Sequence, residues 1–269
     1  ISSYFNCNKE SIIYTSGSSE SNNLVIKGIA ERNKSKGKHI IISAVEHSSV
    51  VAPCNYLSSL GYDISIIPLT KEGTIDLDNL KQTINDETIL VSICTVDSEL
   101  GTVQPIPEIA KIVNNYPNCT FHTDATQAIG KVKIDYTDVD FITFAPHKFF
   151  GVNGFGVLIN KNNTKLIPLI HGGKSTTIYR SGTPVTANVI ALDKALTLAL
   201  DNLDERYKYI KGLNNILRNH FKENNNIHIN SPENAIPNTL NISLIDYDTK
   251  KVISELEKKE IYLSTTTAC

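Results

Sequence analysis

One lysine stands where the chain could use an amine for chemistry. Lys148 follows the apolar run 141–144, which predicts a buried strand that Pro146 must end, because proline cannot donate to a sheet. Open α/β sheets bind ligands beyond the carboxyl ends of their strands, so Lys148 would lie at such an edge. We expect Phe149 and Phe150 to desolvate the amine and lower its pKa, which would let the neutral amine attack a carbonyl carbon. The competing interpretation is a surface lysine on a turn.

The segment 15–19, TSGSS, could bind an anion, because it joins a predicted strand to a predicted helix at 20–33. Free N–H groups and the helix dipole favour negative charge at such a junction, and Gly17 permits close approach. Ser18 and Ser19 add hydroxyl groups. Most strand–loop–helix junctions bind nothing, so this segment alone would decide little.

His47 and Asp124 also follow predicted strands, at 39–45 and 120–123. An imidazole at a strand end could stack on a flat ring and shuttle protons near neutral pH, although a histidine that merely starts a helix fits as well. A carboxylate there could pair with a protonated pyridine nitrogen, although it could instead cap a short helix that begins directly after it. Gln127 is close enough in sequence to reach the same place.

These residues require a scaffold in which strands and helices alternate. Near-continuous apolar strands of this kind predict an α/β fold with a mostly parallel, doubly wound sheet. The predicted strands are 11–14, 39–45, 62–68, 88–96, 120–123, 141–144 and 156–159, and the predicted helices between them are 20–33, 48–60, 76–84, 106–114 and a short one from 125.

The C-terminal part has a different pattern. A long helical stretch at 188–221 contains a break and is followed by a polar linker, and then by a strand at 239–244, a helix at 248–259 and a strand at 261–263. We expect residues 1–203 to form a large ligand-binding domain and residues 204–269 to begin a smaller α+β domain. The absence of Met and the abrupt end suggest that sequence is missing at both termini.

Composition narrows the function classes. A net charge of −2 and a pI near 6.4 give no reason to expect a nucleic-acid or membrane partner. No apolar run approaches the ~18 residues of a spanning helix, and the N-terminus has no signal-peptide pattern. Five cysteines without a CxxC pair argue against a disulfide framework and a zinc site, so a cytoplasmic protein without a metal is expected.

Taken together, a phosphate cradle, a possible ring stacker, a carboxylate and a lysine follow one another at successive strand ends. These are the parts that a pyridoxal 5′-phosphate (PLP) site needs. At this point the sequence resembles the class V aminotransferase group and, within it, the cysteine desulfurases of the iron–sulfur cluster type. The matching segments are YTSGSSESNNLVIKG, EHSSV, ELGTVQPI, HTDATQAIGK, PHKFFG with GFGVL, RSGTP and NTLNISL.

The resemblance implies a PLP-dependent transferase fold and a role for each matching residue. Lys148 would carry PLP, Asp124 would meet the pyridine nitrogen, Gln127 would meet the ring hydroxyl, and His47 would stack on the ring. The residues that would hold the phosphate are Ser18, Ser19 and His147, joined by Thr183 from the other subunit of a homodimer.

The terminal segment LSTTTAC resembles a desulfurase loop whose cysteine attacks the sulfur of L-cysteine, which makes Cys269 the candidate nucleophile. The products would be L-alanine and an enzyme persulfide that passes its sulfur to an acceptor protein or thiol. An unremarkable terminal cysteine is the competing interpretation. A thiolate is required for the attack, so the site would have to deprotonate Cys269.

Two positions depart from the family pattern. Ser98 stands where the family has a longer asparagine that helps to hold substrate and cofactor, and Ala145 replaces a serine that contacts phosphate. These changes keep two alternatives open. One is another class V PLP enzyme, such as a selenocysteine lyase or an aminotransferase, and the other is a non-catalytic dimeric scaffold.

Overall fold

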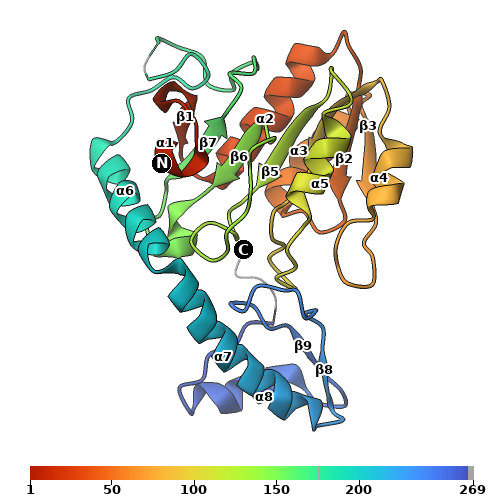
Figure 1. Ribbon diagram of the computed structural model, residues 1–269, viewed down its shortest axis with the longest axis vertical. Coiled ribbons are helices and arrows are strands. Elements are labelled where there is room, and N and C mark those ends of the chain that lie inside the picture. The colour runs from red at the N-terminus through yellow and green to blue at the C-terminus, as the bar shows by residue number, and fades with distance from the viewer. Residues whose placement is uncertain (175, 266–269) are drawn as a thin grey trace.

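The computed structural model describes residues 1–174 and 176–265, and its centre is a seven-stranded sheet (Figure 1). The strand order across the sheet is β1-β7-β6-β5-β4-β2-β3. The strands are β1 (Ile12–Thr15), β2 (His39–Ser43), β3 (Asp63–Ile67), β4 (Thr88–Ser92), β5 (Thr120–Asp124), β6 (Phe141–Phe144) and β7 (Gly156–Asn160).

Strand direction decides where the loops meet. The strands β2 to β6 pair in parallel, whereas β7 is antiparallel to both β6 and β1. Two reversals cancel, so β1 runs in the same direction as β2 to β6. The carboxyl ends of β1, β2, β4, β5 and β6 therefore open onto one edge of the sheet, which is where such sheets bind ligands.

Helices cover both faces of the sheet. Successive strand residues point to opposite faces, so Ile41 packs in one core cluster while Ile40 and Ile42 pack in the other. The helices α2 and α3 cover the Ile40 face, and α4, α5 and α6 lie on the Ile41 face. The bounds are α1 (Ser2–Phe5), α2 (Ser18–Asn33), α3 (Ser48–Ser58), α4 (Leu77–Thr83), α5 (Ile106–Val113) and α6 (Thr186–Asp201), with 3-10 turns η1 (Lys9–Ser11) and η2 (Pro146–Phe149).

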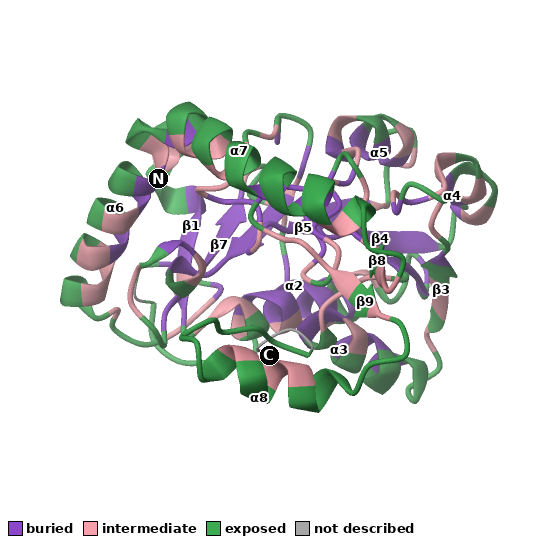
Figure 2. Cartoon of the chain, turned by 90° about the horizontal axis from the view of Figure 1, so that it is seen from below, coloured by how far each residue is buried: buried purple, intermediate pink, exposed green. Residues whose placement is uncertain are grey.

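A smaller unit follows the helix α7 (Leu203–Lys222), which continues the path of α6 after a break at Asn202 (Figure 1). Its two strands, β8 (Ile227–Ile229) and β9 (Ile242–Leu244), pair antiparallel, and α8 (Thr249–Glu257) lies beside them with no buried residue (Figure 2). The break at Asn202 lies next to the boundary expected after residue 203, and the division into two domains stays a prediction.

Most of the predicted elements are confirmed, and the corrections concern short segments. Residues 126–131 form turns and not the helix expected from 125, and 261–263 do not form a strand. The strand expected at 239–244 is limited to β9, whereas β8 lies inside the segment that was expected to be a linker. Among the described residues, no helix is long and apolar enough to cross a membrane.

The loop that precedes α2 packs directly on β7. A Cβ added at Gly156 would lie 2.3 Å from the carbonyl carbon of Gly17, so this contact allows only glycine in the strand. We expect Gly156→Ala to lower the free energy of unfolding by about 1–3 kcal/mol, because backbone must move to relieve the overlap. Chemical denaturation measures this change.

The matched control is Gly212→Ala in α7, where an added Cβ meets no atom within 4 Å. That change should be neutral or stabilise the helix by about 0.5–1 kcal/mol. Equal effects of the two substitutions would contradict the close packing of β7 on the loop.

Candidate active site

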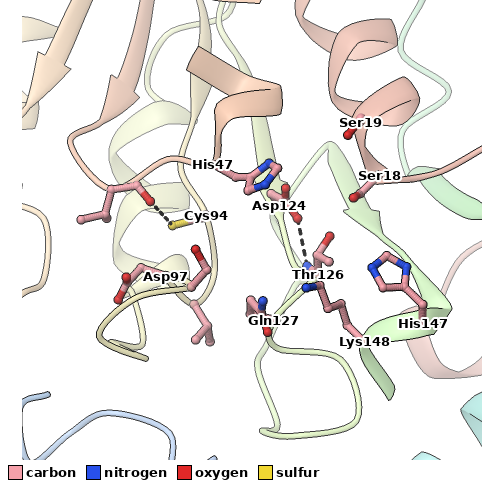
Figure 3. Close-up of a pocket in the computed structure, with 13 residues that line it drawn as sticks. Ser18, Ser19, His47, Cys94, Asp97, Asp124, Thr126, Gln127, His147 and Lys148 are labelled. Atoms are coloured by element: carbon pink, nitrogen blue, oxygen red, sulfur yellow. Dashed lines mark hydrogen bonds between the residues drawn. The ribbon is translucent and has the colours of Figure 1, made fainter. Parts of the chain in front are cut away.

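Five loops from the carboxyl edge of the sheet surround one pocket (Figure 3). They follow β1, β2, β4, β5 and β6, so strand direction alone brings together residues that are far apart in sequence. The lining residues are Ser18, Ser19, Val45, His47, Cys94, Val96, Asp97, Ser98, Asp124, Thr126, Gln127, His147 and Lys148.

The Asp124 carboxylate ends the central strand β5 and is 6% exposed. Its Oδ1 accepts the backbone N–H of Thr126 at 2.9 Å, and its Oδ2 accepts the side-chain amide of Asn22 at 2.8 Å. Both donors are neutral, and within the described part of the chain Asp124 forms no ion pair. A buried carboxylate normally has a cationic partner, so this one fits the protonated nitrogen of a pyridine ring.

The His47 ring lines the pocket close to Asp124 (Figure 3) and also caps α3. Its Nδ1 accepts the backbone N–H of Ser49 at 3.1 Å and lies 2.8 Å from the Ser49 hydroxyl. Both interpretations of His47 therefore hold: it starts a helix, and it lies in the pocket. Capping fixes the ring plane, which suits a side chain that stacks on a flat ligand.

An anion cradle lies at the N-terminus of α2, where Gly17 is the N-cap and Ser18 and Ser19 form the first turn. Glu20 orders this turn by accepting the backbone N–H of Ser16 at 2.7 Å. The same carboxylate pairs with Arg180 at 2.9 Å, and hydrogen bonds, chiefly from Arg180, hold its pKa below the ordinary value despite partial burial. The ion pair ties the loop that contains Thr183 to the cradle.

The Lys148 side chain reaches the pocket from η2, directly after β6 (Figure 3), and is half-buried. The prediction that Phe150 desolvates the Lys148 amine is wrong, because the Phe150 side chain is fully exposed at 104%. Phe149 points into the core instead and packs on Phe144. The Ala145 side chain is buried and offers no hydroxyl to a phosphate.

Gln127 lines the pocket and forms a pair with Lys131, which lies outside the lining. The Lys131 amine donates to Gln127 Oε1 at 2.5 Å, so the amide NH₂ of Gln127 is left to donate to a ligand oxygen. Burial, with a smaller effect of the Lys148 charge, lowers the pKa of Lys131 to about 8. The pair can thus place a hydrogen-bond donor opposite the hydroxyl of a bound ring.

Glu46 precedes His47 and contributes a carboxyl group behind the pocket wall. Its Oε1 accepts the Ser43 hydroxyl at 2.6 Å and the Cys94 backbone N–H at 2.7 Å, whereas Oε2 is buried with no hydrogen bond to the described residues. Burial raises the pKa of Glu46 to about 8, with a smaller contribution from the Asp124 charge. Near neutral pH this carboxyl is therefore mainly protonated.

Seven of the nine predicted site residues line the pocket: Ser18, Ser19, His47, Asp124, Gln127, His147 and Lys148. Thr183 is exposed and does not line it, and Cys269 lies outside the described residues. Sequence reasoning missed Asn22, Ser49, Glu46, Cys94 and Thr126. The position of Glu46 directly before His47 is the signal that could have indicated it, because both follow the same strand.

The pocket fits PLP by its donor set. Thr126 Oγ1 is buried in the lining without a hydrogen bond to any described residue, which leaves a hydroxyl for a ligand. The cradle at α2 suits a phosphate, Asp124 suits a ring nitrogen, and the Lys148 amine suits an aldehyde. In the part of the chain that the structure describes, no three His, Cys, Asp or Glu side chains are grouped as metal ligands.

Comparisons with known proteins agree along nearly the whole chain. A family model described as aminotransferase class-V matches residues 1–269. The cysteine desulfurase IscS of Dictyoglomus turgidum is 39% identical over 264 residues, which are 97% of this chain and 67% of that relative. A NifS/IcsS protein homolog of Lactobacillus delbrueckii subsp. bulgaricus is 39% identical over 97% of this chain and 69% of its own length.

Solved structures give the same result for the fold. A NifS-like protein superposes with a TM-score of 0.93 at 30% identity, covering 98% of this chain and 73% of its own. The structure described as SspA in complex with cysteine has a TM-score of 0.81 at 30% identity, covering 100% of this chain and 75% of its own.

The raised pKa of Glu46 predicts a pH-dependent loss of stability. Because the folded-state pKa of about 8 exceeds the ordinary value of 4.5, the folded protein holds an extra proton between these values. Stability therefore falls as pH rises through this window. We expect Glu46→Gln to remove the loss and to be more stable than the unchanged protein at pH 8, by a few kcal/mol as an order of magnitude.

Denaturation of the cofactor-free protein at pH 5 and pH 8 measures this difference. The exposed Glu72→Gln variant is the matched control and should follow the unchanged protein at both pH values. If the stability of the Glu46→Gln variant and that of the unchanged protein change by the same amount between pH 5 and pH 8, the Glu46 carboxyl ionises in the folded protein as it does in the unfolded chain.

Proposed function

This chain belongs to the aminotransferase class-V family, and we propose that it is a PLP-dependent cysteine desulfurase that converts L-cysteine to L-alanine. One observation carries the proposal: Lys148, Asp124 and His47 line one pocket beside an anion cradle. Relatives named cysteine desulfurase support the choice of reaction within the family.

When bound, PLP supplies an electron sink for the bonds around the substrate's α-carbon. The protein's own residues orient this chemistry. Asp124 would hold a positive charge at the ring nitrogen, Gln127 would donate to the ring hydroxyl, and Ser18, Ser19 and His147 would bind the phosphate. The Lys148 Nζ would hold the cofactor covalently, and Lys148 or His47 would move the proton of the substrate's α-carbon.

Sulfur transfer requires a nucleophile, and we assign it to Cys269. Its thiolate would attack the sulfur of the bound cysteine, forming an S–S bond as the substrate's C–S bond breaks. The product on the protein is a persulfide whose outer sulfur passes to an acceptor protein or thiol. The structure described as SspA in complex with cysteine supports the choice of substrate class.

The assembly and location belong to the same proposal. Thr183 lies on an exposed loop outside the pocket, which suits a residue that reaches the phosphate of a second subunit in a homodimer. Residues 1–203 would form the PLP-binding domain and residues 204–269 part of the domain that ends in the catalytic loop. Iron–sulfur cluster assembly in the cytoplasm is the expected setting, with neither nucleic acid nor membrane as partner.

The rival functions predict different products. A selenocysteine lyase would release selenide, and an aminotransferase would transfer the amino group to a keto acid. A non-catalytic scaffold would bind no PLP, in spite of the four residues Lys148, Asp124, Gln127 and His47 that are placed for it.

The first test is the visible absorbance of the full-length protein with added PLP. We expect a yellow band and, after borohydride reduction, a cofactor bonded to the Lys148 peptide in mass spectrometry. Lys148→Ala should show neither, whereas Lys133→Ala, an exposed lysine that pairs with Asp204, should behave as the unchanged protein. A colourless protein that ignores PLP would favour the scaffold.

The second test concerns the nucleophile. Cys269→Ala should keep the yellow band but lose persulfide formation and at least about 100-fold in alanine release, because no thiolate is left to take the sulfur. Cys7→Ala is the matched control, since Cys7 is half-buried away from the pocket. Sulfur transfer by the Cys269→Ala protein at the normal rate would assign the reaction to another group.

A further inference from the structure

A chain of hydrogen bonds runs behind the pocket from His47 to Asp124. The two residues follow different strands and are joined by Ser49, on α3, and Asn22, on α2. Asn22 is fully buried and Ser49 is 8% exposed, so water does not compete for these bonds.

The donor and acceptor in each bond follow from the chemical groups. Asp124 can only accept, so the Asn22 amide nitrogen donates to it at 2.8 Å. The second N–H of that nitrogen donates to the Ser49 oxygen at 2.8 Å. The Ser49 hydroxyl proton is then left for the His47 Nδ1, which lies 2.8 Å away.

The backbone N–H of Ser49 independently requires His47 Nδ1 to be a hydrogen-bond acceptor. The Ser49 N–H points at His47 Nδ1, and a nitrogen that accepts this bond cannot itself carry a proton. The Asn22 Oδ1 is buried without a hydrogen bond to any described residue, so the amide is turned toward its two acceptors although its oxygen stays unpaired. Such an orientation is costly unless both donated bonds matter.

We propose that Asn22 and Ser49 are positioning residues that hold the His47 ring with Nδ1 as a hydrogen-bond acceptor, and so with the ring proton on Nε2, and connect it to the Asp124 carboxylate. His47 then offers the pocket a flat ring and one N–H donor. A proton on Nδ1 would break the backbone bond from Ser49 and reverse the hydroxyl bond, so both contacts favour the ring proton on Nε2.

The role of the network rests on the proposed PLP chemistry, whereas the state of the His47 ring does not. The test is therefore a ¹H–¹⁵N spectrum of the histidine rings of full-length protein at pH 7.5, recorded with and without added PLP. His47→Gln identifies the His47 signals by their loss. We expect the pattern of an imidazole protonated on Nε2 alone, in both samples.

A His47 signal from an Nδ1–H ring or from a doubly protonated ring in the unchanged protein would overturn the proposal, and this result needs no variant to fold. A ring with the expected proton in a protein that lacks desulfurase activity would refute the proposed function only. The two failures are therefore distinguishable.

Variants test the two linking residues. In Ser49→Ala the backbone bond alone remains, so we expect a second, Nδ1–H form of His47 to appear and kcat for cysteine to fall about five- to tenfold, with KM changed less than about twofold. Asn22→Leu should change the His47 ring pattern in the same way, because the Ser49 hydroxyl is no longer held, and should lower kcat further, because Asp124 also loses a donor. Ser49→Thr keeps the hydroxyl and should restore the ring pattern and kcat.

Ser59→Ala is the matched control, because Ser59 lies at the other end of α3, where its hydroxyl donates to the Tyr56 carbonyl. It should leave the spectrum and kcat unchanged. If Ser49→Ala and Asn22→Leu fold and give the unchanged spectrum, Asn22 and Ser49 do not hold the ring and the proposal is wrong. A loss of kcat in Ser49→Ala that Ser49→Thr fails to restore would also contradict it.

Discussion

A buried negative charge at the end of the central strand is the constraint on which the site depends. Asp124 is almost inaccessible to water, and removing a carboxylate from water costs several kcal/mol unless other groups offset the loss. The described residues supply only the neutral donors Asn22 and the Thr126 N–H. A cation bound in the pocket, such as a protonated ring nitrogen, would add to this stabilisation.

Burial favours the uncharged form of two titratable neighbours of Asp124. Glu46 is kept mainly protonated by burial, with a pKa of about 8. His122, two positions earlier on β5, is fully buried between Ser92 and Thr143, and burial lowers its pKa to about 4. In this water-poor surrounding the Asp124 charge acts strongly on the pocket, whose lining also contains Asp97 and Lys148. This arrangement favours an electron-withdrawing positive ring nitrogen at one place.

The parts that could be predicted from sequence are those set by apolar periodicity. Buried strands such as Thr88–Ser92 and Phe141–Phe144 are mostly apolar runs, and their common direction places Lys148, Asp124 and His47 at one edge. Short segments were less predictable. The three residues of β8 become a strand only because α7 and β9 pack beside them, and Phe150 is exposed because its left-handed backbone, with φ 65°, turns the chain away.

Ser98 lines the pocket from a loop that hydrogen bonds hold in place. Asp97, buried beside Ser98, accepts the backbone N–H groups of Glu99, Leu100 and Thr102, and so fixes the turn. The smaller unit packs on the same turn, where the Ile236 N–H donates to the Gly101 carbonyl at 2.8 Å. The position of Ser98 in the pocket is therefore fixed both by the Asp97 carboxylate and by the contact with the smaller unit.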